Sequence, residues 1–207
     1  MDITKIVITG GPCGGKSTAM AKIQNAFSEK GYTVLFVPET ATEFITGGVA
    51  PWTCGTNAEY QKCQMLLQLE KERLFEQAAR TMPKEKILIV CDRGTMDNMA
   101  YMDEKETAEV LEYIRKDKET LLGSYDAVFH LVTAANGAEE FYTTANNSAR
   151  IETPPEAVAL DNKLISAWGS HPSFYIIDNS TGFEGKMNRL VEKISDFLGI
   201  NQPAGVR

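Results

Sequence analysis

A glycine-rich stretch near the start of the sequence has the residue types and the spacing of a phosphate-binding loop. Residues 10–17 read GGPCGGKS, so that two glycines frame four residues and Lys16 and Ser17 close the motif. Glycines let successive backbone N–H groups turn inward around an anion, and Lys16 adds a point charge near the β- and γ-phosphates. The sequence therefore predicts a nucleoside triphosphate site. The residues expected to contact the nucleotide here are Gly11, Cys13, Gly14, Gly15, Lys16, Ser17 and Thr18.

The chemistry of such a loop also needs a divalent cation, and the sequence offers two ligands for it. The hydroxyl of Ser17 is expected to hold Mg²⁺. The apolar run at residues 87–91 (ILIVC) ends at Asp92, and an acid at the end of the strand beside the loop holds Mg²⁺ directly or through water. Arg93 follows, and its planar guanidinium suits phosphate oxygens or the carboxylate of Glu39; a structural salt bridge is the alternative.

A second group of residues could hold the molecule that receives a phosphoryl group. The run at residues 33–37 (TVLFV) leads to Glu39, where an acid faces the ligand crevice of an open parallel sheet and could orient or deprotonate a hydroxyl. The alternative for Glu39 is a surface acid that caps the next short helix. Side chains that could stack on a planar ring or hydrogen-bond to it follow: Trp52, Tyr60, Gln61 and Gln64. For each of these four, ordinary packing or a surface position is the alternative.

Residues 138–155 have the composition of a lid over the reacting groups. The segment is polar and irregular, and its arginine, Arg150, could swing over the phosphoryl group while closure excludes water; a mobile surface loop is the alternative. The segment leads into TPPE at residues 153–156, a capping box with proline at the first helical position, which predicts a helix that runs to about Trp168. Asn179, after the last predicted strand, is a candidate contact to the nucleotide base.

Short apolar runs alternate with helical patterns along the chain, which predicts a single three-layer α/β domain over residues 1–200 and a frayed tail at 201–207. The runs expected to be strands are residues 3–9, 33–37, 87–91, 127–131 and 174–177. A long helix is expected from Asn57, and one side of it would carry Tyr60, Cys63, Leu67, Glu70 and Leu74. An amphipathic helix is expected over residues 186–198. His130 lies inside an apolar run, which favours a buried core histidine over a catalytic one.

Composition limits the kinds of partner. Of 207 residues 43% are hydrophobic and 24% charged, which is typical of a globular domain with a well-buried core. The formal net charge of −7 speaks against a general nucleic-acid or anionic-membrane surface, so phosphate chemistry must take place in a local positive pocket. The four cysteines form no C-x-x-C pair, which indicates free thiols in a reducing compartment. No apolar run approaches about 18 residues and no leader pattern is present, so we expect a cytoplasmic protein without membrane insertion.

The motifs together resemble a known family over nearly the whole chain. The phosphate loop, Pro38-Glu39-Thr40, Asp92-Arg93-Gly94 and Arg150-x-Glu152 look like the P-loop kinase-like AAA domain shared by bacterial nicotinamide riboside kinase (the NadR type) and the TRPL translocation defect protein. The resemblance implies a five-stranded parallel sheet in the order 2-3-1-4-5, ATP or GTP with Mg²⁺, and phosphoryl transfer to a small acceptor. It also implies that Glu39 corresponds to the acceptor-binding acid of nucleoside kinases.

Two functions from different classes remain open at this point. The first is a small-molecule kinase in which Glu39 acts on the acceptor hydroxyl, while Lys16, Arg93 and Arg150 stabilise the phosphoryl group. The second is a nucleotide-dependent regulatory switch with slow or no turnover. A guanine-reading Asn-Lys-x-Asp motif is absent from the sequence, which weakens a switch of that type but leaves GTP open as a ligand. The oligomeric state is open as well.

The sequence also predicts the charge of the acceptor. A monophosphate would need its own cationic clamp, usually arginine, because a planar fork matches phosphate oxygens. Between Glu39 and the third strand the arginines are Arg73 and Arg80, and both lie several turns down the long helix from the strand end. We therefore expect an uncharged hydroxyl acceptor, such as a nucleoside.

Overall fold

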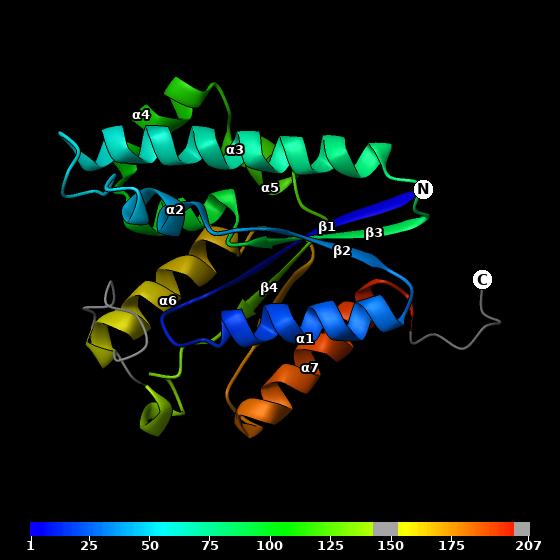
Figure 1. Ribbon diagram of the computed structural model, residues 1–207. Helices are drawn as coiled ribbons and strands as arrows, with labels where there is room; N and C mark the ends of the chain where they lie inside the picture. The colour runs from blue at the N-terminus through cyan, green and yellow to red at the C-terminus, as the bar shows by residue number, and fades with distance from the viewer. Residues whose placement is uncertain (143–152, 201–207) are drawn as a thin grey trace.

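The computed structural model describes residues 1–142 and 153–200, which form three layers with a parallel sheet between two layers of helices (Figure 1). The five strands are β1 (Asp2–Gly10), β2 (Thr33–Val37), β3 (Lys86–Asp92), β4 (Ala127–Leu131) and β5 (Phe174–Ile177). All neighbouring pairs are parallel, and the order is β2-β3-β1-β4-β5. The predicted strands and the sheet order implied by the family resemblance are both confirmed.

The connections between the strands are mostly helical. The α-helices are α1 (Lys16–Glu29), α2 (Thr40–Thr46), α3 (Asn57–Thr81), α4 (Glu104–Ile114), α5 (Lys118–Leu122), α6 (Pro154–Trp168) and α7 (Gly182–Phe197). Two 3₁₀ helices, η1 (Thr95–Tyr101) and η2 (Glu139–Phe141), follow β3 and β4. None of the helices in the described parts of the chain is both long enough and apolar enough to span a bilayer.

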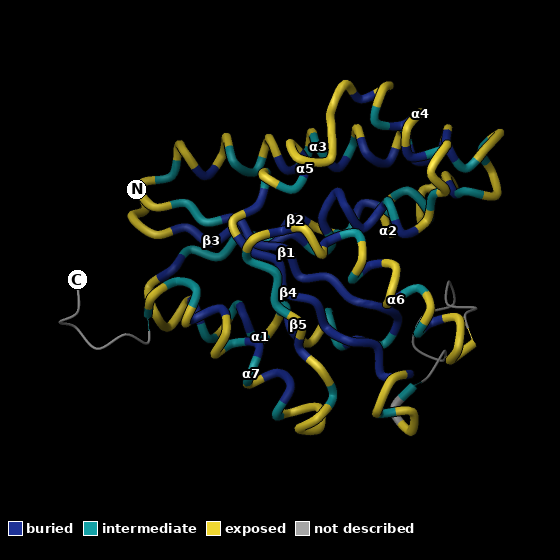
Figure 2. Tube along the Cα trace, turned by 180° about the vertical axis from the view of Figure 1, so that it is seen from behind, coloured by how far each residue is buried: buried dark blue, intermediate teal, exposed yellow. Residues whose placement is uncertain are grey.

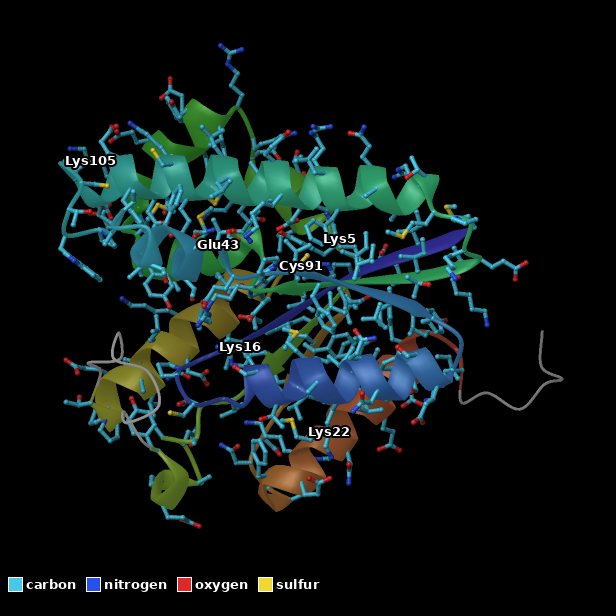
Figure 3. The ribbon with its side chains drawn as sticks, in the orientation of Figure 1. Lys5, Lys16, Lys22, Glu43, Cys91 and Lys105 are labelled. Carbon is cyan, nitrogen blue, oxygen red and sulfur yellow. The ribbon has the colours of Figure 1, made fainter. Side chains whose placement is uncertain are left out.

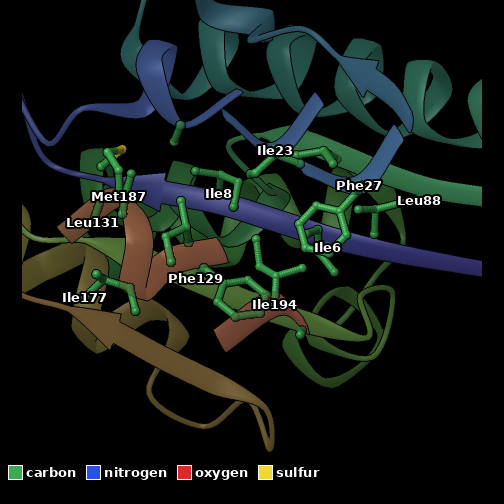
Figure 4. Packing of buried hydrophobic residues seen from close by; sticks show 14 of the residues in the cluster. Ile6, Ile8, Ile23, Phe27, Leu88, Phe129, Leu131, Ile177, Met187 and Ile194 are labelled. Atoms are coloured by element: carbon green, nitrogen blue, oxygen red, sulfur yellow. The ribbon is translucent and has the colours of Figure 1, made fainter. Parts of the chain in front are cut away.

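Alternate residues of the central strands point to opposite faces, so the sheet has a core on each side. Ile6 and Ile8 of β1 pack against α1 and α7, where Phe27 belongs to the same cluster (Figure 4). Val7 points the other way and packs with residues of α3 and with Trp168 at the end of α6. These side chains are fully buried, and the tube in Figure 2 shows burial along the central strands. The two cores fix the sheet and leave its ends to carry polar groups.

Two helices differ from their predicted form. The buried side of α3 carries Gln61, Gln64, Met65 and Gln68, whereas Cys63 and Leu74 on the predicted side are exposed. Hydrophobic periodicity predicted the wrong buried side of α3, because that side carries buried polar side chains as well as apolar ones. The helix α7 begins at Gly182, four residues before the predicted start at residue 186. The sequence did not indicate this first turn because it contains glycines, which are poor helix formers.

The register of the strands gathers the predicted site residues at one edge of the sheet. Cys91 is paired with Val37, and Asp92 is paired with Ile8. The loop after Gly10, the turn that carries Glu39 and the turn after Asp92 therefore lie next to one another. This is the carboxyl edge of the strands, where ligands bind in open α/β sheets. In Figure 1 it lies at the end of the sheet away from the amino terminus.

Candidate active site

The predicted phosphate-binding loop connects β1 directly to α1. Cys13 and Gly15 have left-handed backbone conformations, with φ of 57° and 94°, so the chain winds tightly before α1 begins at Lys16. The loop also lies close to the main chain of β4, because a Cβ atom on Gly14 would come within 2.6 Å of the carbonyl oxygen of Leu131. Glycine is therefore required at this position. The positive dipole end of α1 lies at the loop, which favours an anion there.

Lys16 lies at the amino end of α1, and Figure 3 shows it near the strand ends. Its Nζ donates a hydrogen bond to the carbonyl oxygen of Gly10 at 3.4 Å. Burial, together with the charge of Arg93, lowers the pKa of Lys16 to about 8, while the acids Glu39 and Asp92 oppose the shift. Within residues 1–142 and 153–200 no carboxylate forms an ion pair with Lys16. Its charge is therefore left for a phosphate group.

Side chains from β4, from the segment after it and from α6 hold the loop at Gly11 and Pro12. The backbone N–H of Gly11 donates to Oδ1 of Asp161 at 2.7 Å, and Nε2 of His130 lies 3.0 Å from the same oxygen. The Thr133 hydroxyl donates to the carbonyl oxygen of Pro12 at 2.5 Å. His130 is fully buried and hydrogen-bonded, as expected of a core histidine. Asp161 was not predicted, because its contact depends on how α6 packs against β1 and no sequence pattern marks it.

Glu39 and Arg93 form an ion pair at the ends of β2 and β3. Nε of Arg93 donates to Oε1 of Glu39 at 2.5 Å, and the hydroxyl of Thr42 donates to Oε2 at 2.6 Å. Burial alone would raise the pKa of Glu39, but the charges of Arg93 and Lys16 together with these hydrogen bonds lower it to about 2. Glu39 occupies the N-cap position of α2, yet its side chain makes no capping hydrogen bond. Its carboxylate is therefore ionised at neutral pH and directed to Arg93.

Asp92 fits the predicted metal role. Its Oδ1 is buried and has no hydrogen-bond partner among the described residues, and an orphaned carboxylate oxygen of this kind is satisfied by a cation or by the water around one. Burial raises the pKa of Asp92, and the nearby charge of Lys16 opposes the rise. Ser17 is exposed at the start of α1. The described residues contain no group of three or more His, Cys, Asp or Glu that could hold a metal; Mg²⁺ beside a phosphate loop needs none, because phosphate oxygens and water complete its shell.

A cavity of about 380 Å³ lies beside the Glu39–Arg93 pair. It is lined by all four residues that were predicted to face an acceptor, Trp52, Tyr60, Gln61 and Gln64. Tyr60 is only 2% exposed, and burial raises its pKa to about 12, whereas Trp52 is 72% exposed and stands at the rim. The grouping that the sequence suggested is therefore present in space. The walls come from α2, the loop before α3, α3 itself and η1.

The 3₁₀ helix η1 and the inner side of α3 add cavity residues that were not predicted. Asp97 accepts a hydrogen bond from the backbone N–H of Gly94 at 2.7 Å and another from the Thr9 hydroxyl, and it lies 3.5 Å from Nη1 of Arg93. Asp97 thus contacts a different nitrogen of the Arg93 guanidinium from the one that Glu39 binds. Asn98 and Gln68 are also buried in the cavity wall. Asp97 and Asn98 could have been found from the sequence, because they are adjacent polar residues shortly after the predicted strand at residues 87–91. Such a pair also occurs in surface turns, so it did not indicate a cavity by itself.

The side-chain amide of Asn179 is engaged within the protein. Its Nδ2 donates to the carbonyl oxygens of Thr133 at 2.8 Å and Asn136 at 2.7 Å, and its Oδ1 accepts from Nζ of Lys186 at 2.9 Å. Lys186 is 2% exposed, and burial lowers its pKa to about 8. Asn179 therefore holds the loop after β4 in this structure. Its contact to a nucleotide base stays a prediction.

Part of the predicted lid lies outside the described residues. This applies to Arg150 and to the rest of residues 143–152, and also to the tail at 201–207. At the edges of the gap, η2 covers Glu139–Phe141, and the predicted capping box at Thr153 is present, with the backbone N–H of Thr153 donating to Oε2 of Glu156 at 2.7 Å.

The sheet order and the glycine-rich loop between β1 and α1 define a P-loop NTPase domain. A family model described as an AAA domain matches residues 5–186, and the chain belongs to that family. Among solved structures, the chain is similar to deoxyadenosine kinase from M. mycoides with bound dATP, with a TM-score of 0.61 and 16% identity over 93% of this chain and 99% of that chain. This likeness is one of fold. No curated protein sequence matches the chain.

Proposed function

We propose that this protein is a small-molecule kinase that transfers a phosphoryl group from ATP or GTP, with Mg²⁺, to a hydroxyl of an uncharged, nucleoside-like acceptor. One observation carries the proposal: the Glu39–Arg93 pair lines the 380 Å³ cavity and at the same time lies in the field of Lys16. A kinase needs a cavity for the acceptor beside its phosphate-binding loop, whereas a nucleotide switch does not. The similar fold of a deoxyadenosine kinase and the resemblance to nicotinamide riboside kinase support a nucleoside as the acceptor.

The donor side of this mechanism rests on the phosphate loop. Its backbone N–H groups and the amino end of α1 would bind the β- and γ-phosphates, and Lys16 would neutralise charge that develops on the transferring group. Ser17 and Asp92 would hold Mg²⁺, and the unpartnered Oδ1 of Asp92 supports that role. When bound, the cation supplies further neutralisation of the phosphate oxygens. Arg150 would add a cation from the segment between η2 and α6.

The acceptor side rests on Glu39. With a pKa of about 2, Glu39 is a weak base but a strong hydrogen-bond acceptor, so its role is to orient the attacking hydroxyl. Phosphoryl transfer passes through a loose transition state in which the acceptor oxygen needs little activation, and positioning matters more than base strength. Arg93 holds the carboxylate in place, and Asp97 holds Arg93. The three side chains thus form one positioning unit in the cavity lining.

The charge of the cavity supports an uncharged acceptor. Among the described residues that line it, Arg93 is the one cation, and Arg93 is already paired with Glu39 and Asp97. A phosphate dianion there would meet two carboxylates and no unpaired arginine. Trp52 and Tyr60 offer aromatic faces to a planar ring instead.

The test is direct. The purified protein is incubated with Mg-ATP or Mg-GTP and a panel of nucleosides, and phosphorylated product is detected by mass spectrometry, with Lys16→Ala as the inactive control. The proposal predicts a phosphorylated nucleoside that forms with the wild type and not with the variant. Tight nucleotide binding without product across the panel would favour the switch.

A further inference from the structure

A buried ion pair joins β1 to the inner side of α3, away from the acceptor cavity. Nζ of Lys5 lies 3.3 Å from Oε2 of Glu72 and 2.6 Å from Oε1 of Glu76, and Figure 3 shows Lys5 between the sheet and α3. Lys5 is 7% exposed and Glu72 is 3% exposed, and neither of them lines the cavity. Desolvation offsets most of the attraction within a buried pair, so net stability alone does not account for this one.

The other oxygen of Glu72 accepts hydrogen bonds from two buried side chains. The hydroxyl of Tyr125 donates to Oε1 of Glu72 at 2.9 Å, and Nε2 of Gln68 donates to the same oxygen at 3.2 Å. Water does not compete for these bonds, because both donors are only 5% exposed. Glu72 therefore fixes the orientation of both side chains, while Lys5 compensates its charge.

These two side chains also bind the main chain of the turn that follows β3. The hydroxyl oxygen of Tyr125 accepts from the backbone N–H of Thr95 at 2.8 Å, and it can do so because its own proton is donated to Glu72. Nε2 of Gln68 donates to the carbonyl oxygen of Arg93 at 3.4 Å. Glu72 is therefore the common support of two contacts, one at each end of the turn.

The turn needs support because its backbone is unusual. Arg93 has a φ of 67°, a left-handed conformation that is uncommon for residues other than glycine. Its backbone N–H donates to the carbonyl oxygen of Ile8 at 3.0 Å, which fixes the start of the turn to the sheet. In this conformation its Nε reaches Glu39. Relaxation of the backbone to a negative φ would redirect the side chain away from that carboxylate.

We propose that Glu72 is a positioning residue for Arg93 in the acceptor site. Its two hydrogen-bonded neighbours hold the turn after β3 in the conformation that directs the guanidinium at Glu39. The inference rests on the proposed function, because it deepens the account of how the orienting carboxylate is kept in place. The helix α3 would then both line the cavity and support its one ion pair from behind.

A double-mutant cycle in urea unfolding tests this without any ligand. Glu39→Gln removes the carboxylate that Arg93 binds, and Tyr125→Phe removes the hydroxyl between Glu72 and the turn. In the part of the chain that the structure describes, Glu39 and Tyr125 share no hydrogen bond or ion pair, so coupling between them must pass through the turn. The loss of unfolding free energy caused by Glu39→Gln should be about half as large in Tyr125→Phe as in the wild type.

Two variants of α3 show whether Glu72 is the cause. Glu72→Met should reduce the effect of Glu39→Gln in the same way, and Lys5 keeps Glu76 as a partner in that variant. Glu76→Met is the matched control, because it removes the other acid that binds the same lysine, one turn further along the helix. The bonds to the tyrosine and the glutamine stay intact in this control, so Glu39→Gln should cost as much there as in the wild type.

The ring of Tyr125 keeps Tyr125→Phe informative even if Glu72→Met does not fold. Phenylalanine retains the packing of this ring against Trp168, so Tyr125→Phe then decides alone. With any nucleoside that the panel above shows to be phosphorylated, Tyr125→Phe should lower kcat roughly tenfold and leave the affinity for Mg-ATP unchanged. Combined with Arg93→Ala, it should be no slower than Arg93→Ala alone, because both changes act through one guanidinium.

The outcomes separate this inference from the proposed function. A full effect of Glu39→Gln in Tyr125→Phe, an equally reduced effect in Glu76→Met, or no effect of Glu39→Gln in the wild type would overturn the role of Glu72. A reduced effect in Tyr125→Phe and Glu72→Met together with no phosphorylated product would support the role of Glu72 and contradict the kinase.

Discussion

Replacement of Glu39 by glutamine removes one charge at the centre of the site and keeps the shape of the side chain. The pKa of Glu39 falls from 4.5 to about 2, although burial acts in the opposite direction. A tenfold change in an ionisation constant corresponds to about 1.4 kcal/mol, so the ionised carboxylate is stabilised by about 3 kcal/mol in the folded protein. The side chain is 26% exposed, so little of this is lost to solvent screening.

The sign of the effect on stability follows from the direction of the shift. Because the folded pKa is below the unfolded one, the contribution is fully present above about pH 4.5 and is lost as the pH falls toward 2. Glu39→Gln should therefore lower the free energy of unfolding by up to about 3 kcal/mol at pH 7 and by clearly less at pH 3. Urea unfolding at both pH values measures this. Glu43→Gln, which removes a more exposed acid paired with Lys71, is the matched control and should have a smaller effect.

The same variant tests the role of Glu39 in transfer. Nucleotide affinity should persist, while transfer to the acceptor should fall by roughly 10²-fold, because the neutral amide is a weaker acceptor for the hydroxyl and no longer forms the ion pair with Arg93 that holds it in place. Since Glu39 stays ionised down to about pH 2, the wild-type kcat/KM for the acceptor should show no loss from this group between about pH 5 and 7. Collapse of nucleotide affinity with transfer per bound nucleotide retained would show that the acceptor pocket has been misplaced. An acid limb near pH 5 that is absent from the residual activity of the variant would refute the lowered pKa.

Three further predictions concern the donor side. Lys16→Ala should abolish turnover without loss of folding, which product detection by mass spectrometry and a melting curve check. Wild-type affinity for Mg-ATP should weaken above about pH 8, as the lysine of the free protein loses its proton; calorimetric titrations from pH 7 to 9 measure this, and an unchanged affinity across that range would count against the lowered pKa. Asp92→Asn should raise the Mg²⁺ concentration needed for half-maximal rate by about tenfold, and an unchanged requirement in a metal titration would remove Asp92 from the metal site. Arg150→Ala should lower kcat far more than ATP affinity, because its charge is needed mainly in the reacting state; equal losses would make it a ground-state contact.

Much of the fold was predictable because its signals are local. Each strand is a short apolar run, and the glycine-rich loop and the TPPE capping box mark helix starts through backbone chemistry that any fold must satisfy. The inner side of α3 was not predictable in this way. Its glutamines are buried because Asn98 and main-chain carbonyls from another segment hold them, and periodicity cannot register a partner that is distant in sequence.

The site divides in the same manner. Lys16, Glu39 and Asp92 lie at or shortly after strand ends, and since parallel strands end at one edge, sequence position was enough to group them. Asp161 and Asp97 act through contacts that depend on helix packing, so they became visible only in the structure. The engaged amide of Asn179 shows the reverse case, because a residue at the expected place can have its hydrogen bonds used within the protein.

The most direct test of the central claim is a coupled ADP-release screen of nucleosides against the matching nucleoside monophosphates, with Mg-ATP as donor and nicotinamide riboside included. Arg93 is the one cation among the described residues that line the cavity, and it is paired with two acids. We therefore expect turnover with one or more nucleosides and little with the monophosphates. Robust turnover that is confined to the monophosphates would contradict it.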